Sequence, residues 1–154
     1  MKYLMFGMLI SRNRLRVREE GLATFIEYLT VEKLNHREYL NYVTNWFLQV
    51  ANREVAGDKR LKTVPMVDFG KQEMTDYSYS IGMIAFRILY EILGEEKFNH
   101  SLRTFYQEYA GKEATTEDFV RVTKRVSGKD MSAFFNDWFF TTGYISHFGE
   151  TINF

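Results

Sequence analysis

Apolar residues recur at helical spacing along most of the chain after residue 20. The first stripe of this kind consists of Leu22, Phe25, Ile26 and Leu29. These positions stand at i, i+3, i+4 and i+7, the pattern of one buried face of an amphipathic helix. Acidic residues begin the stretch, where the helix macrodipole favours them. We therefore predict helices over residues 19–32, 36–50, 96–109, 115–127 and 130–139.

The stretch 77–93 has a different pattern, because it is apolar on nearly every side. A helix that is apolar all round is usually buried, so we predict that this one lies in the centre of the fold. Gly94 follows it and is typical of the position just after a helix. Thr115, with Asp118 three residues later, predicts a capping box at the start of the helix over 115–127.

Three segments lie outside this helical pattern. Residues 3–10 form an apolar run, which predicts a buried strand or helix fragment. In residues 11–18 arginine alternates with other residues, which favours an extended segment with one basic face. Residues 51–70 contain Gly57 and Pro65, both of which interrupt regular structure. We predict an irregular surface loop beside a cleft for 51–70.

The pattern as a whole predicts a mainly α fold of about six helices, with no strong strand after residue 20. The chain has 154 residues, which suits one domain or part of a larger one. Lys plus Arg equal Asp plus Glu at 20 each, so the charge does not favour a nucleic-acid partner. The absence of cysteine excludes disulfides and thiolate metal sites. The apolar run at 3–10 is too short to span a bilayer, so we predict no transmembrane segment in this chain.

Candidate chemistry begins at the start of the first helix. Glu20-Gly21-Leu22-Ala23 resembles the Asn-Glu-Gly-Phe/Leu-Ala motif of the zinc aminopeptidases related to membrane alanyl aminopeptidase and the puromycin-sensitive enzyme. In that family the Glu before the Gly is the third protein ligand of the catalytic zinc, so the resemblance implies this metal role for Glu20. The spacing alone indicates only a solvated carboxylate at the start of a helix.

A second motif lies at the start of the predicted buried helix. Tyr79-Ser80-Ile81-Gly82 resembles the family's Tyr-x-Lys-Gly motif, with Ile81 in place of the usual Lys. The resemblance implies that Tyr79 is the catalytic tyrosine. A phenol held near a reacting carbonyl can donate a hydrogen bond to the oxyanion that develops there. Without the resemblance, Tyr79 is one of ten tyrosines and a half-buried structural role is the simpler interpretation.

Further matches occur in the same order as in the family. They are Gly94-Glu95-Glu96-Lys97-Phe98, Thr116-Glu117-Asp118-Phe119, Ser127-Gly128-Lys129-Asp130-Met131, Phe134-Phe135, Trp138 and Gly143-Tyr144. The resemblance implies the helical half of a thermolysin-like metallopeptidase catalytic domain. We expect 1–18 to be a remnant of the segment that follows the metal-binding helix, 19–147 to be the helical aminopeptidase subdomain, and 148–154 to be a tail leading to a missing domain.

The family's zinc motif, His-Glu-x-x-His, is absent from the sequence. That motif places two imidazole ligands on one helix face with the general base between them. The three histidines here are His36, His100 and His147, and none has a partner at i+4. Glu20 and Tyr79 provide one ligand and one oxyanion donor but no base. We therefore expect that this chain alone neither binds zinc tightly nor cuts peptides, whether the motif is missing through truncation, an incomplete gene model or true loss.

These observations favour a fragment or degenerate member of the zinc aminopeptidase family, whose members remove N-terminal residues from peptide substrates. The alternative is a non-catalytic helical interaction module. Half of a catalytic domain should expose apolar surface, which predicts self-association or a protein partner. Family members occur in the cytoplasm and on membranes, so the resemblance does not choose a compartment.

Overall fold

The computed structural model describes residues 20–34, 38–74 and 76–149, and within these ranges its regular structure is entirely helical. The α-helices are α1 Leu22–Lys33, α2 Tyr39–Gly57, α3 Tyr77–Leu93, α4 Glu95–Tyr109, α5 Thr116–Ser127 and α6 Ser132–Phe135. Shorter helical turns are η2 Lys59–Lys62, η3 Met66–Lys71, η4 Asn136–Phe140 and η5 Gly143–His147. The prediction of a mainly α fold with about six helices is confirmed. The predictions for residues 3–10 and 11–18 lie outside the described residues.

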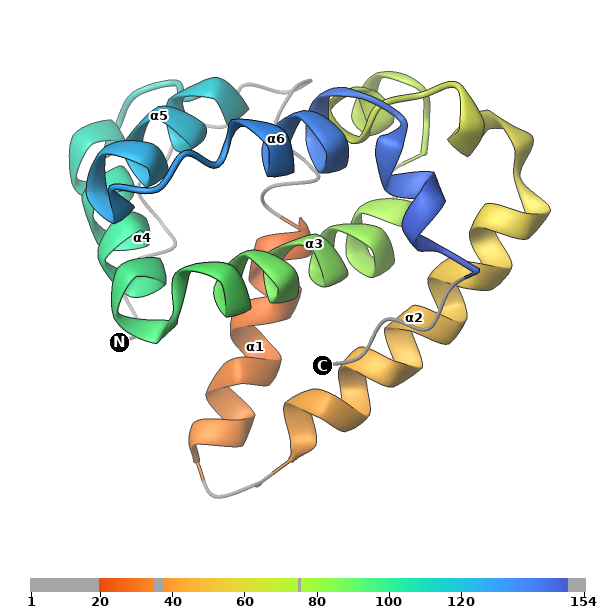
Figure 1. The fold of residues 1–154 in the computed structure, drawn as a ribbon, viewed down its shortest axis with the longest axis horizontal. Helices are drawn as coiled ribbons and strands as arrows, with labels where there is room; N and C mark the ends of the chain where they lie inside the picture. The colour runs from red at the N-terminus through yellow and green to blue at the C-terminus, as the bar shows by residue number, and fades with distance from the viewer. Residues whose placement is uncertain (1–19, 35–37, 75, 150–154) are drawn as a thin grey trace.

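Helix α3 is the centre of the molecule (Figure 1). It packs against α1 and α2 on one side and against α4 at its C-terminal end, and α4 pairs with α5. Ile81, Met83, Ile84 and Phe86 have no exposed surface at all. The interpretation of 77–93 as a buried helix is therefore confirmed. Gly94 ends the helix with a φ of 78°, a backbone conformation that favours glycine.

Helix α2 is longer than the sequence pattern predicts. The apolar stripe continues through Ala51 and Val55, which are both buried, so the helix runs on to Gly57. The prediction of irregular structure was therefore wrong for 51–57, because small and polar residues hide the continuing stripe.

The segment that follows α2 consists mostly of the short helical turns η2 and η3 and contributes to the core. Leu61, Met66 and Phe69 are fully buried. The buried hydroxyl of Tyr144 donates hydrogen bonds to the carbonyl oxygens of Leu61, at 2.8 Å, and of Val64, at 3.0 Å. Tyr144, near the end of the described chain, therefore anchors this segment, whereas an irregular surface loop beside a cleft was expected.

The start of α5 has the predicted cap. The hydroxyl of Thr115 accepts a hydrogen bond from the backbone of Asp118 at 3.2 Å, and the carboxylate of Asp118 accepts one from the backbone of Thr115 at 2.8 Å. The helix ends at Gly128 with a φ of 67°. None of the helices described here combines the length and apolarity needed to cross a membrane.

One face of α2 leaves aromatic side chains in solvent. Trp46 is 51% exposed and Tyr42 is 69% exposed. Leu34, at the end of α1, is 70% exposed. Tyr42 and Trp46, four residues apart, thus share an exposed face of α2.

Candidate active site

The site starts at the segment that leads into α1. Residues 20 and 21 form a wide helical turn just before α1, and the hydroxyl of Thr24 donates a hydrogen bond to the carbonyl oxygen of Glu20 at 2.7 Å. Gly21 is buried against α3, where an added Cβ would lie 2.7 Å from the backbone of Gly82 and 3.0 Å from the carbonyl oxygen of Ser78. A glycine is favoured here because any side chain would collide with backbone atoms of α3 unless the two helices moved apart.

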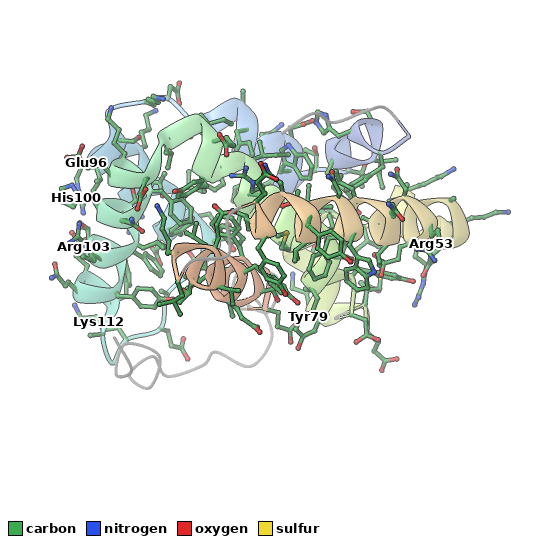
Figure 2. All side chains as sticks on the ribbon, turned by 90° about the horizontal axis from the view of Figure 1, so that it is seen from below. Arg53, Tyr79, Glu96, His100, Arg103 and Lys112 are labelled. Carbon is green, nitrogen blue, oxygen red and sulfur yellow. The ribbon has the colours of Figure 1, made fainter. Side chains whose placement is uncertain are left out.

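This close approach brings the two motifs together. Gly21 is the neighbour of Glu20, and the 78–82 segment that it touches contains Tyr79. Glu20 is half-buried, with its Oε2 atom shielded from solvent. Tyr79 is 45% exposed and lies well apart from His100 of α4 (Figure 2). The backbones next to both predicted site residues thus meet, whereas convergence of the two side chains on one ligand stays a prediction.

A set of polar contacts joins α2 to the same turn. The hydroxyl of Ser80 donates a hydrogen bond to the carboxylate of Glu54. The hydroxyl of Tyr77 donates one to Asp58 at 2.7 Å, and Asp58 also accepts from the guanidinium of Arg60 at 2.9 Å. Residues on both sides of Tyr79 are therefore bound to the C-terminal end of α2.

The two carboxylates of this set have opposite electrostatic environments. Burial raises the pKa of Glu54, since the charged form loses solvation, and this outweighs the hydrogen bond from Ser80, which lowers the pKa. The hydrogen bonds from Arg60 and Tyr77 hold the pKa of Asp58 well below its usual range. The sequence pattern did not identify Glu54 or Asp58, which both fall in the segment predicted to be irregular. Their spacing of i and i+4 at the end of one helix was the available signal.

The described residues do not by themselves fit a catalytic zinc ion. Such a site uses three protein ligands with one open position, and no three His, Cys, Asp or Glu side chains gather in the part of the chain that the structure describes. His147 pairs with Asp137, at 2.5 Å between Nε2 and Oδ2, and stacks on Trp138. His100 lies on the exposed face of α4, and His36 is outside the described residues. Glu20 would therefore need ligands from elsewhere to hold a metal.

Two open hollows are found away from this turn. One is lined by Asn52, Val55, Ala56, Lys62, Ile145, Phe148 and Gly149. The other follows one face of α4 and is lined by Glu96, His100, Arg103, Thr104 and Gln107. Neither hollow is lined by Glu20 or Tyr79.

Comparison with known proteins identifies the family. The sequence pattern of the peptidase family M1 domain matches residues 15–138. Aminopeptidase M1-B of Oryza sativa subsp. japonica is 30% identical over 131 residues, which is 81% of this chain and 15% of that protein. Probable aminopeptidase 2 of Sulfurisphaera tokodaii is 31% identical over 87 residues, which is 54% of this chain and 11% of that protein.

A shorter match is found with Aminopeptidase N of Escherichia coli, 31% identical over 65 residues, covering 42% of this chain and 7% of that protein. No solved structure matches the chain significantly. The chain spans about 15% of the length of the rice aminopeptidases that it matches. Zinc dependence is a property of the family as a whole. The match over 15–138, which contains both Glu20 and Tyr79, shows that this chain belongs to peptidase family M1.

Proposed function

We propose that this chain is the helical half of a zinc aminopeptidase catalytic domain, acting on the N-terminal residue of peptides. In this proposal Glu20 is the third protein ligand of the zinc and Tyr79 is the oxyanion donor. The observation that carries it is the contact of Gly21 with Ser78 and Gly82, which places the backbone beside the proposed ligand against the turn that bears the proposed donor. Membership of the family supports the same roles.

The proposed catalytic role of Tyr79 follows from its position at the start of α3. Its phenol would donate a hydrogen bond to the oxygen of the scissile carbonyl as negative charge develops there. A donor that is already in position stabilises this charge without having to reorganise, which makes such a contact one of the larger contributions to a rate. The general base and two further metal ligands are not among the described residues, so the chain alone should not turn over peptides.

The proposal is tested with two proteins. The first is the chain as it stands, for which we expect no stoichiometric zinc and no hydrolysis of an aminoacyl p-nitroanilide. The second is a hybrid that adds an upstream family segment carrying His-Glu-x-x-His in front of residue 15. This hybrid should bind one zinc ion and hydrolyse the same compound.

Variants of the hybrid separate the two roles. Glu20→Gln should remove the bound zinc together with the activity, because the metal loses its carboxylate ligand. Tyr79→Phe should keep the zinc and lower kcat by about 100-fold or more, the effect typical of losing one oxyanion donor. Tyr42→Phe is the matched control, since Tyr42 is exposed on α2. Full activity in the Tyr79→Phe hybrid, or tight zinc in the Glu20→Gln hybrid, would refute the assigned role.

A protein partner is a second proposal, supported by the exposed side chains of Leu34, Tyr42 and Trp46. Large apolar side chains exposed to solvent favour contact with another protein surface. Sedimentation of the chain over a range of concentrations tests self-association through these side chains. A monomer at all concentrations, with the same behaviour in Trp46→Gln, would count against it.

A further inference from the structure

The start of α3 is held by two other elements. The backbone of Gly21, just before α1, lies against Ser78 and Gly82. The C-terminal end of α2 also reaches this turn, through Glu54 and Asp58. Tyr79 lies within this turn and is directed outward, with 45% of its surface exposed.

The contact between Glu54 and Ser80 is the more sheltered of the two contacts from α2. Ser80 is only 2% exposed, and its hydroxyl lies within hydrogen-bond distance of both the Glu54 carboxylate and the carbonyl oxygen of Tyr77, at 3.4 Å for the latter. A hydrogen bond to a carboxylate is stronger than one between neutral groups, and it fixes direction as well as distance. This bond therefore restricts how far the turn can rotate about the axis of α3.

Rotation of this turn matters because Tyr79 has a long side chain. Functional groups have to be held within about 0.5 Å and 10–20° of their working geometry. The phenol oxygen lies at the far end of the side chain, so a small rotation of the backbone moves it by a larger distance. The neighbour of Tyr79 in sequence, Ser80, is the residue whose side chain is fixed to α2.

We propose that Glu54 is a positioning residue for Tyr79, acting through the hydroxyl of Ser80 to set the direction of the phenol. This inference rests on the proposed function, because the direction of the Tyr79 phenol matters for catalysis only if Tyr79 is the oxyanion donor. Glu54 itself touches no substrate in this proposal. Burying the Glu54 carboxylate is unfavourable, and the hydrogen bond from Ser80 offsets part of that penalty.

The first experiment uses the chain as it stands and does not depend on zinc. The protein is labelled with tyrosine that carries carbon-13 at Cζ, and the signal of Tyr79 is assigned by its loss in Tyr79→Phe. Glu54→Ala and Ser80→Ala should each shift or broaden this signal. The double variant should change it no further than one single variant, because the two side chains act through one bond.

Two further variants keep the experiment decisive. Glu54→Gln retains an oxygen that can accept from Ser80, so it should leave the Tyr79 signal close to its original position even if Glu54→Ala folds poorly. Glu108→Ala removes an exposed carboxylate that pairs with Arg125 far along the chain, and it should change nothing. An unmoved Tyr79 signal in folded Ser80→Ala, or additive changes in the double variant, would overturn the inference.

The second experiment uses the zinc-binding hybrid and separates this inference from the proposed function. Glu54→Ala should lower kcat by about 10- to 100-fold, with zinc stoichiometry kept and KM changed less than kcat, as expected for a misplaced donor. Glu54→Gln should restore most of kcat. If Tyr79→Phe leaves the hybrid fully active, the proposed function fails, while the signal of Tyr79 still decides whether Glu54 sets its orientation. If Tyr79→Phe lowers kcat and Glu54→Ala does not, the positioning role alone is wrong.

Discussion

Gly21 lies so close to Gly82 that a methyl group on the first would stand 2.7 Å from backbone atoms of the second. Gly21→Ala should therefore force α1 and α3 apart and lower the free energy of unfolding by about 1–3 kcal/mol. Urea denaturation followed by circular dichroism measures this change.

Gly57→Ala is the matched control for that substitution. An added Cβ at Gly57 meets nothing within 4 Å, and Gly57 is the last residue of α2. The better helix propensity of Ala should leave the stability unchanged or raise it by up to about 1 kcal/mol. Equal stability losses in the two variants would contradict a tight contact at Gly21.

Tyr144→Phe should weaken the segment between α2 and α3. The hydroxyl of Tyr144 is buried and donates to the carbonyl oxygens of Leu61 and Val64, so its removal leaves two carbonyl groups with a lost partner. Burial also raises the pKa of Tyr144, which keeps the hydroxyl protonated and able to donate. We expect a loss of about 1–3 kcal/mol in the free energy of unfolding. Tyr42→Phe, at a 69% exposed position, is the control and should have little effect.

Asp58 should make the fold less stable in acid. The hydrogen bonds from Arg60 and Tyr77 hold the pKa of Asp58 below its unfolded value of about 3.9, so the folded state binds the proton less readily. Its contribution to stability is present above that unfolded value and is lost as the pH falls toward the folded pKa. Asp58→Asn should flatten this acid limb in urea midpoints measured at a series of pH values. A variant curve parallel to the original would show that Asp58 makes no such contribution.

Glu54 should have the opposite pH dependence. Its pKa is raised in the folded state, chiefly by burial, so its favourable contribution is present below the unfolded value of about 4.3 and is lost as the pH rises to the folded pKa. Glu54→Gln should remove this decline and make the chain at least as stable as the original at pH 7. The same urea series measures it. A greater stability loss in the glutamine variant at pH 7 than at pH 4 would contradict the assigned shift.

Secondary structure was predicted most accurately from the sequence where a helix has one clear pattern of apolar residues. Helix α3 is apolar on nearly all sides and was predicted over the same residues, and the capping box at Thr115 is a local arrangement that the sequence contains in full. The end of α2 was missed because Asn52, Arg53 and Glu54 break the visible pattern while Ala51 and Val55 continue the buried face.

Contacts between distant segments account for what the sequence pattern could not predict. Tyr144 donates hydrogen bonds to Leu61 and Val64, which lie about 80 residues earlier in the chain. No local sequence pattern predicts contacts between residues so far apart. Similarly, Glu20 and Tyr79 were identified because each stands in a recognisable motif. Glu54 belongs to no motif, and Ser80, its hydrogen-bond partner, occupies the position x of the Tyr-x-Lys-Gly motif. Their hydrogen bond could therefore not be predicted from the sequence.

The placement of the two tryptophans gives the chain a built-in optical reporter. Trp138 is 3% exposed beneath the imidazole of His147, whereas Trp46 is 51% exposed on α2. Emission from the first should be blue-shifted and from the second red-shifted, because the indole excited state responds to the polarity around it. Replacing Trp46 by phenylalanine would therefore leave a spectrum that follows only the C-terminal turns, so that their detachment could be observed separately from global unfolding.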